Sequence, residues 1–413
     1  MRDVSGKRLL ILGGQLKMLD IVKRAREMGV YTVVTDWYED SPAKALADKA
    51  FDISIADHET ILSLIREERI DGVFTGFIDS YLPHYYEICR KAGFPCYLNQ
   101  EILACSTDKR QFKTVCRSMG IQTVPDVDIS DLAAVRYPIV MKPVDNSGSK
   151  GITICCDENM LAPAIERAKR FSKSKRYLVE PLMVCDYIAA YYTVRNGAAK
   201  LSLLMDKDTN RVGRGKISYP VAYVSPSRYR DKYVRKVQPL IEKLIARLGM
   251  QNGTFLISFF VSGMDFYAVE MAARLTATRE YIITGEDILG KYIHYALTGI
   301  FEGEGRDHYE NDGGITCMLL HFINEGTIGK IEGIEEVKKM NGLLDVLQYR
   351  NVGAKIRADG SYGQLFCRIY LRGDTAEEII DTVEDVQRSF QVYSTDHRPM
   401  LFTGFDARSF FNG

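Results

Sequence analysis

Short apolar runs alternate with helically spaced apolar residues through the first hundred residues of the chain. The run Leu9–Leu12 predicts a buried strand that ends at Gly13-Gly14, and a helical pattern follows over residues 18–28. The same alternation predicts strands over 31–35, 51–55, 72–75 and 95–98, and helices over 59–69 and 82–92. Because a parallel neighbour is reached only through a crossover, this order predicts a parallel sheet. We expect a Rossmann-like α/β domain over residues 1–105.

The pair Gly13-Gly14 has two interpretations. It could belong to a dinucleotide-binding turn, although Asp36 stands where many α/β sheets simply end a strand. The full G-x-G-x-x-G spacing is absent, however, so the pattern favours a plain tight turn.

From Ser106 onward the pattern changes to α+β. It predicts a helix over 109–119, strands over 137–143 and 152–155, a helix over 160–173 and a strand over 177–179. Two strands joined by a turn at Ser262-Gly263 should pair as a hairpin, which would set Ser258 beside Glu270. After about residue 301 the pattern is mixed again, with a helix over 375–390 and a strand over 391–395.

Composition limits the classes of function. The chain has 413 residues, 46% hydrophobic and 26% charged, which is more than one core usually organises. Lys plus Arg equals Asp plus Glu at 54 each, so no global charge favours nucleic acid or an anionic membrane. Nine scattered cysteines without C-x-x-C spacing, and no signal or membrane-spanning run, indicate a cytoplasmic protein with reduced thiols.

The segment 145–151, Asp-Asn-Ser-Gly-Ser-Lys-Gly, is a candidate phosphate loop between two strands. Small residues in such a turn let several backbone N–H groups approach phosphate oxygens, although a flexible hairpin without ligand fits the loop equally well. Lys142 favours the phosphate interpretation. It ends the apolar run Ile139–Met141, where an ammonium is costly without an anionic partner, and a triphosphate would supply one.

Two further pieces flank Lys142 in sequence. Lys109 stands at the start of a predicted helix, where its ammonium could join a nucleotide site or be an ordinary surface charge. Tyr177–Met183 provides a strand, the carboxylate of Glu180 and an apolar stretch whose backbone could pair with an adenine edge.

In this order the pieces resemble the ATP-grasp superfamily, in particular the carboxylate-amine ligases and the related biotin carboxylase and carbamoyl phosphate synthetase large-chain folds. The resemblance implies an N-terminal Rossmann-like pre-ATP-grasp domain, ATP-grasp lobes over 106–300 with a lid at about 142–185, and a C-terminal α+β portion, 301–413, that completes the fold. It implies ATP and Mg²⁺ as cofactors. The nucleotide-binding residues it implies are Lys109, Lys142, Ser147, Gly148, Ser149, Gly151, Glu180, Pro181, Leu182, Met183 and, on the ribose, Asp186.

The strongest local match is the hairpin that carries Glu270 and Arg274. The family places a carboxylate on each strand, then Asn and Arg after the second, so Glu270 is implied as the metal ligand and Arg274 as the catalytic residue that steadies the transferring phosphoryl group. This chain has Ser258 and Ala272 where the first carboxylate and the Asn are expected. Because Mg²⁺ prefers carboxylate, phosphate and water oxygens, one ion could still bind at Glu270, and a second would need another acid such as Asp206 or Asp208.

Other basic groups are harder to interpret. Arg211, Arg214 and Lys216 stand among glycines, as a loop over a carboxylate substrate or, in the favoured interpretation, as a solvated turn. Arg350, Lys355 and Arg357 raise the same question. The six histidines form no nucleophile or zinc pattern and are expected to be structural.

The resemblance implies an ADP-forming ligase that activates a small-molecule carboxylate as an acyl phosphate for attack by an amine, and it allows for a homodimer. Two alternatives stay open. Ser258 and Ala272 would suit an ATP-binding protein with reduced or lost catalysis that acts as a binding or regulatory module. A bicarbonate-using enzyme, like carbamoyl phosphate synthetase or biotin carboxylase, would keep the fold and change the substrate. The sequence does not identify the carboxylate or the amine.

Overall fold

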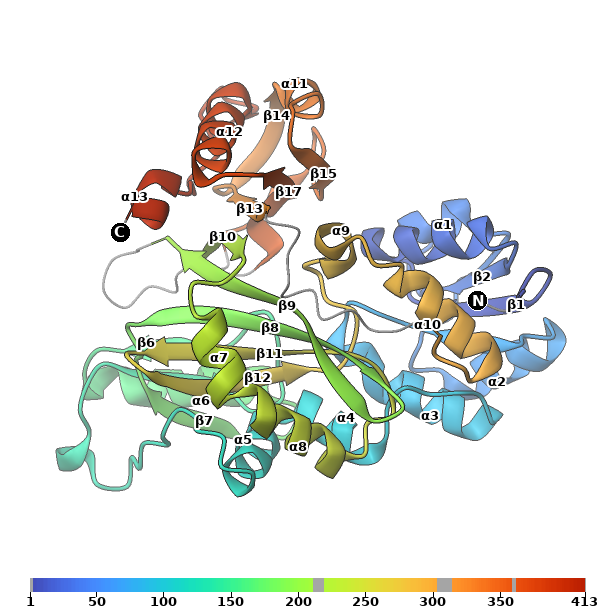
Figure 1. The fold of residues 1–413 in the computed structure, drawn as a ribbon, viewed down its shortest axis with the longest axis horizontal. Coiled ribbons are helices and arrows are strands. Elements are labelled where there is room, and N and C mark those ends of the chain that lie inside the picture. Colours follow the sequence, from blue (N-terminus) through green and yellow to red (C-terminus); the bar gives the residue numbers. More distant parts are fainter. Residues whose placement is uncertain (1–2, 211–218, 303–313, 359–361, 413) are drawn as a thin grey trace.

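The protein has a mixed α/β fold, which a computed structural model describes over residues 3–210, 219–302, 314–358 and 362–412. The N-terminal strands, the central strands and the C-terminal helices occupy three corners of the molecule (Figure 1). No helix within these ranges combines the length and apolar character that crossing a lipid bilayer requires.

The N-terminal part contains the predicted parallel sheet. Its four strands run in the order β3-β2-β1-β4, and every neighbouring pair is parallel. The elements are β1 (Arg8–Leu12), α1 (Leu19–Glu27), β2 (Tyr31–Thr35), β3 (Lys49–Phe51), α2 (His58–Glu67), β4 (Gly72–Phe74) and α3 (Leu82–Ala92). The predicted alternation of strands and helices is thus confirmed as far as α3, except that the strand predicted over 51–55 lies at 49–51 and residues 52–55 are not in a strand.

The predicted strand over 95–98 is wrong. Pro95 has no backbone N–H to give to a ladder, and the segment instead inserts Tyr97 into the core. The Tyr97 ring packs against Tyr85 and Tyr292, with centroids 4.9 and 5.0 Å away, and its hydroxyl donates to the carbonyl of Thr75 at 3.1 Å. Next come α4 (Gln100–Thr107) and α5 (Lys109–Ser118).

A three-stranded sheet, in the order β6-β5-β7, forms a separate small layer. Its strands are β5 (Ile139–Pro143), β6 (Thr153–Cys155) and β7 (Tyr177–Pro181), with α6 (Leu161–Phe171) packed on them. All four elements lie where the sequence predicts them.

The largest sheet has eight strands in the order β12-β11-β8-β9-β10-β13-β17-β15 and joins the central and C-terminal parts of the chain. Its strands are β8 (Asp186–Arg195), β9 (Ala198–Thr209), β10 (Pro220–Ser225), β11 (Asn252–Ser262), β12 (Asp265–Ala272), β13 (Ile315–Phe322), β15 (Leu343–Gln348) and β17 (Leu365–Gly373). Between them come α7 (Arg230–Lys236), α8 (Gln238–Leu248), α9 (Glu280–Thr284) and α10 (Ile288–Thr298).

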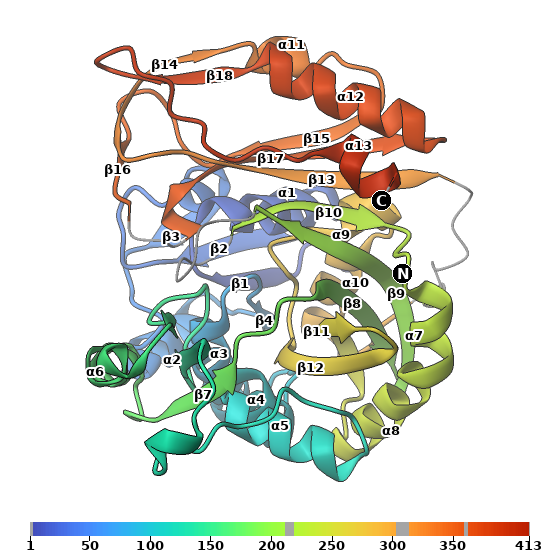
Figure 2. The ribbon, with the colours of Figure 1, turned by 90° about the vertical axis from the view of Figure 1, so that its left-hand side faces the viewer.

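A last three-stranded sheet, β16-β14-β18, lies near the C-terminus with the predicted amphipathic helix. Its strands are β14 (Gly326–Glu332), β16 (Lys355–Ile356) and β18 (Gln391–Ser394), and its helices are α11 (Ile334–Val337), α12 (Ala376–Ser389) and α13 (Ala407–Asn412). In Figure 2, α12 covers the outer side of this region, over a core that includes Ile379, Val383 and Val386. The helix predicted over 375–390 and the strand after it are confirmed.

One apolar core runs from the parallel sheet into the eight-stranded sheet. Helix α10 makes the connection, because it lies so close to β4 that a Cβ on Gly72 would come within 2.2 Å of the Ala296 carbonyl oxygen. The N-terminal sheet is therefore held firmly against the strands that carry the candidate site.

Candidate active site

A pocket of about 450 Å³ opens where the N-terminal part meets the edge of the eight-stranded sheet. Helices α3 to α5, the 145–148 turn and strand β12 all contribute to its wall. Of the residues that the sequence singles out, the pocket brings together Lys109, Ser147, Gly148, Glu270, Ala272 and Arg274. Segments far apart in the chain thus converge here.

The hairpin β11–β12 positions the acidic side of the pocket. Its register pairs Ser258 with Glu270, as predicted. Ser258 is buried and hydrogen-bonded to Tyr187, whereas the Glu270 side chain keeps 46% of its exposure and has a carboxylate oxygen 3.9 Å from the Lys109 ammonium. The described ranges contain no group of three or more His, Cys, Asp or Glu residues that would hold a metal ion by itself. A magnesium ion at Glu270 would therefore take most of its ligands from phosphates and water.

The turn after β5 is anchored at its start and end. The Asp145 carboxylate accepts a hydrogen bond from the backbone N–H of Ser174 at 2.8 Å, and the Asn146 side chain donates one to the Phe171 carbonyl at 2.8 Å. At the other end Gly151 has φ +81°, and a Cβ there would lie 2.6 Å from that of Phe171, so no other residue fits. Ser147 and Gly148 face the pocket between these anchors, and Ser149 and Gly151 lie outside its lining.

Lys109 connects this turn to the acidic side. Its ammonium donates to the Asn146 carbonyl at 2.5 Å and lies near Glu270, and its backbone N–H donates to Val144 at 2.9 Å. Lys109 therefore faces the pocket and is not an ordinary surface charge.

Arg274 follows β12 and forms a bidentate ion pair with Asp79. Its Nε and Nη2 both donate to the carboxylate of Asp79, each at 2.7 Å. Burial alone would raise the pKa of Asp79, but the charge and hydrogen bonds of Arg274 more than offset it and lower that pKa below its ordinary value. The pair lines the pocket and links the hairpin to the N-terminal part.

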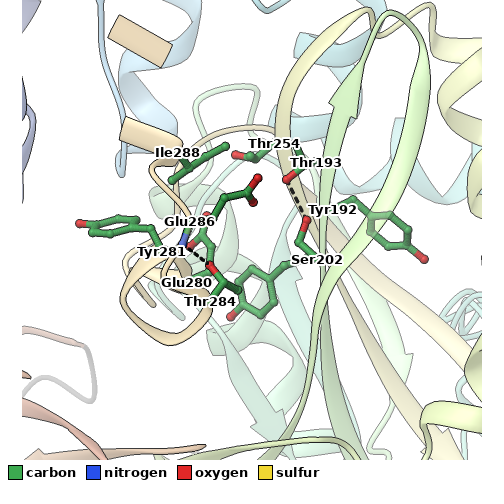
Figure 3. Close-up of a pocket in the computed structure, with 10 residues that line it drawn as sticks. Tyr192, Thr193, Ser202, Thr254, Glu280, Tyr281, Thr284, Glu286 and Ile288 are labelled. Atoms are coloured by element: carbon green, nitrogen blue, oxygen red, sulfur yellow. Dashed lines mark hydrogen bonds between the residues drawn. The ribbon is translucent and has the colours of Figure 1, made fainter. Parts of the chain in front are cut away.

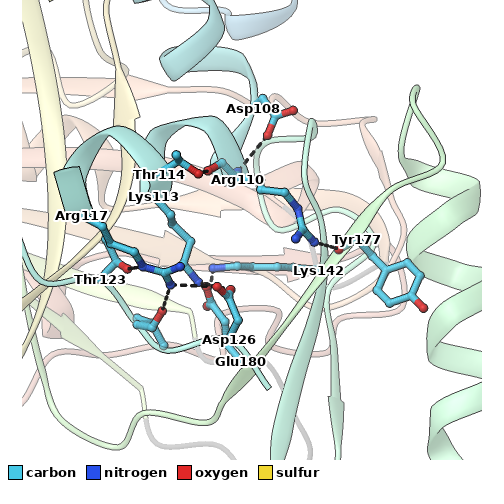
Figure 4. A network of polar contacts seen from close by, with 11 residues as sticks. Asp108, Arg110, Lys113, Thr114, Arg117, Thr123, Asp126, Lys142, Tyr177 and Glu180 are labelled. Carbon is cyan, nitrogen blue, oxygen red and sulfur yellow. Dashed lines mark hydrogen bonds and ion pairs between the residues drawn. The ribbon is translucent and has the colours of Figure 1, made fainter. Parts of the chain in front are cut away.

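Lys142 differs most from the sequence-based expectation, because its anionic partner is a protein carboxylate (Figure 4). Its ammonium lies 2.6 Å from one oxygen of Glu180, and Lys113 lies 2.7 Å from the other. Lys113 also pairs with Asp126 at 2.6 Å. The side chains of Lys113, Glu180 and Lys142 are only 3, 5 and 7% exposed, and neither Lys142 nor Glu180 lines the pocket.

Lys113 was missed in the sequence analysis. It stands on the face of α5 that also buries Phe112 and Cys116, so a lysine within an apolar helical stripe was the available signal. That signal predicts a buried charge but does not identify the partner.

The segment that the resemblance assigns to adenine and ribose follows Glu180 directly. Pro181 pairs with Ile139 in the ladder, and the Leu182 N–H donates to the Pro138 carbonyl at 3.1 Å. Asp186, at the start of β8, accepts a hydrogen bond from the Tyr229 hydroxyl. Leu182, Met183 and Asp186 lie outside the lining of the pocket, and their assigned roles remain predictions.

Lys207 is a second residue that the sequence analysis did not assign to the site. Its ammonium lies 3.9 Å from the centre of the Tyr187 ring and 6.0 Å from that of Tyr223. Burial lowers the pKa of Lys207 to about 8, against the opposing effect of the Glu270 charge. Asp206, considered above as a second metal ligand, instead binds Ser227 and Arg228.

The remaining basic groups divide into those the structure describes, Arg350, Lys355 and Arg357, which do not line the pocket, and those it does not describe. Arg211, Arg214 and Lys216 lie outside the described residues. Arg350 donates to the carbonyl of Gly363 at 3.0 Å, Lys355 lies in β16, and Arg357 is exposed.

A second cavity, beneath α9, is too small for a substrate (Figure 3). Its volume of about 10 Å³ is roughly that of one water molecule. It is lined by Glu280, whose carboxylate accepts a hydrogen bond from Thr276 at 2.8 Å and whose pKa burial raises to about 7. This cavity is part of the packing around α9.

The two glycines after β1 form a tight turn. A Cβ on Gly13 would lie 2.4 Å from the Tyr81 ring, and one on Gly14 would lie 2.5 Å from the Ser41 Cβ. The Gly14 N–H donates to Asp36 at 2.6 Å, so this carboxylate holds the turn in place.

Comparisons with known proteins agree with this geometry. Residues 135–281 match the family model of the ATP-grasp domain. A formate-dependent phosphoribosylglycinamide formyltransferase from Wolinella succinogenes is 22% identical over 276 residues, which cover 65% of this chain and 70% of that protein. An L-amino acid ligase from Bacillus licheniformis has a similar structure, with a TM-score of 0.78 and 19% identity, over 95% of this chain and 99% of that one. An N5-carboxyaminoimidazole ribonucleotide synthetase from Thermotoga maritima also has a similar structure, with a TM-score of 0.70 and 18% identity, over 94% of this chain and 99% of that one.

Proposed function

We propose that this chain, a member of the ATP-grasp superfamily, is an ATP-dependent ligase that activates a small-molecule carboxylate as an acyl phosphate for attack by an amine. One observation carries the proposal. Lys109, the 145–148 turn, Glu270 and Arg274 line a single pocket, and three of these four lie in the matched region 135–281. The names of the similar proteins, a ligase, a synthetase and a formate-dependent transferase, support the same chemistry.

The chain's own contribution would be positioning and charge neutralisation. Lys109 and the backbone of Ser147 and Gly148 would bind phosphate oxygens, and Glu270 would hold a magnesium ion that neutralises charge on the phosphates. Arg274, fixed by Asp79, would face the negative charge that develops on the transferring phosphoryl group. We assign residues 142–185 as the lid, Glu180–Met183 to the adenine and Asp186 to the ribose.

Ser258 supports a second candidate, nucleotide binding with little or no turnover. It replaces a carboxylate with a hydroxyl that Tyr187 already engages, so a single acid remains for the metal. Chemistry that needs two bound metal ions would then be slow.

The two candidates differ in their products. Purified protein with Mg-ATP and pooled carboxylates and amines should release ADP in proportion to the acceptor if it is a ligase, with bicarbonate as a separate arm. Glu270→Ala should lower this release about 100-fold, whereas Asp265→Asn, on the exposed start of the same strand, should preserve it. ATP binding without ADP release in any arm would favour the second candidate. Absence of ATP binding would refute both.

A further inference from the structure

The hairpin β11–β12 offers ligands for one magnesium ion and not for two. Ser258 is opposite Glu270 in the ladder, where the resemblance implies a second carboxylate, and Ala272 stands where it implies an Asn. A buried hydroxyl already bonded to Tyr187, and a methyl group, thus replace two of the hard oxygen ligands that Mg²⁺ prefers. Of the acids on this hairpin, Glu270 is the one that lines the pocket.

A lysine lies beside the place of the missing carboxylate. Tyr187 of β8 is hydrogen-bonded to Ser258, and the Lys207 ammonium lies over the Tyr187 ring, 3.9 Å from its centre. On its other side Lys207 is opposite Tyr223 of β10, whose ring centre is 6.0 Å from the ammonium. Contacts through one aromatic ring therefore join the ammonium to Ser258, on the face of the sheet that carries Glu270.

Lys207 is the charged group that this part of β9 presents on that face. Asp206 and Asp208 alternate with it along the strand, so their side chains point to the opposite face of the sheet. Among the described residues, none accepts a hydrogen bond from the Lys207 ammonium and no carboxylate forms an ion pair with it. Burial lowers the pKa of Lys207, and the charge of Glu270 opposes that effect. Two aromatic rings thus hold a cation whose hydrogen-bond donors can bind an anion.

We propose that the Lys207 ammonium takes the place of a second magnesium ion and neutralises phosphate oxygens of the nucleotide beside the ion held by Glu270. The inference rests on the proposed function. A fixed ammonium can stabilise the charge on a transferring phosphoryl group much as a metal ion does, because both attract its oxygens. An ammonium on a covalent tether needs no carboxylate to hold it, so a serine is tolerated where a metal site requires an acid. Ser258 therefore marks an altered site and not a lost one.

The test counts the divalent ions that bind together with the nucleotide. Mn²⁺ is the probe, the full chain is kept in excess over a non-hydrolysable ATP analogue, and electron paramagnetic resonance measures the ions bound per complex. The wild type should bind one ion. Ser258→Glu should also bind one, because Lys207 pairs with the introduced carboxylate. The double variant Lys207→Met/Ser258→Glu should bind two.

The affinity for the analogue provides a second readout. Lys207→Met should weaken its Kd at least ten-fold, whereas Lys207→Arg, which keeps the charge, should change it less than three-fold. The double variant should return to within three-fold of the wild type, because the second ion restores the missing positive charge. Lys200→Met, near the exposed start of the same strand, is the control and should change the Kd less than two-fold.

The outcomes separate this inference from the proposed function. Two bound ions in the wild type or in Ser258→Glu, a single ion in the double variant, or an unchanged Kd in Lys207→Met would each overturn the inference and leave the proposed function intact. Absence of analogue binding to the wild type would refute the proposed function, and the inference with it. If Lys207→Met does not fold, as shown by circular dichroism, the ion count in Ser258→Glu decides.

Discussion

Two groups of basic side chains in this protein differ in whether protein carboxylates neutralise them. Around Glu180, the ammonium groups of Lys113 and Lys142 lie 2.7 and 2.6 Å from the two oxygens of a single carboxylate, and Asp126 adds a second acid. Around Tyr349, Lys17 and Arg368 have no carboxylate partner among the described residues. The first group is neutralised by protein carboxylates, and the described part of the chain supplies none to the second.

The comparison bears on how a buried charge should be interpreted. A buried lysine needs an anion, but the partner can be a protein side chain as readily as a ligand. In the sequence, Lys142 predicts a triphosphate as the anionic partner of its ammonium. In the structure that partner is the carboxylate of Glu180. A buried basic side chain therefore indicates a ligand only when no carboxylate of the folded chain pairs with it.

The largest expected effect comes from breaking the complete group. Glu180→Gln would leave two buried ammonium groups facing a neutral amide, which should lower the free energy of unfolding by about 3–5 kcal/mol. Urea denaturation would measure the loss. The control is Glu166→Gln, an exposed carboxylate paired with Lys169, and it should change stability by less than about 0.5 kcal/mol. Similar midpoints for both variants would show that Glu180 does not hold the lysines in place.

Glu270 differs from Glu180 because it faces the pocket with nearly half of its side chain exposed. Glu270→Ala leaves Lys109 bonded to the Asn146 carbonyl, so stability should change by less than about 1 kcal/mol. Magnesium-dependent ADP release should fall about 100-fold, or about 2.7 kcal/mol of transition-state stabilisation. Full activity in the variant would remove Glu270 from the metal site.

Arg368→Met should change stability in the opposite direction to Glu180→Gln. It removes an unpaired buried charge, so the ligand-free protein should gain about 1–2 kcal/mol in the free energy of unfolding. The matched control Arg372→Met, at the exposed end of β17, should have little effect. A loss of several kcal/mol would mean that Arg368 is already compensated within the fold.

Much of the fold follows from local patterns. Apolar periodicity locates α3, α5, α12 and the strands of the small sheet, because burial of one face imposes that period on the sequence. The register of Ser258 and Glu270 could also be predicted, since a short turn fixes the pairing of a hairpin. The segment 95–98 was misread because its apolar residues serve core packing and not a ladder.

The site is less predictable because its partners are distant in sequence. The ion pair between Arg274 and Asp79 joins the segment after β12 to the N-terminal part. Lys17 and Arg368 come from opposite ends of the chain, and both lie near the ring of Tyr349. No spacing rule connects such residues. Their type and burial pattern identify candidates, but only the folded chain shows which charges are already neutralised.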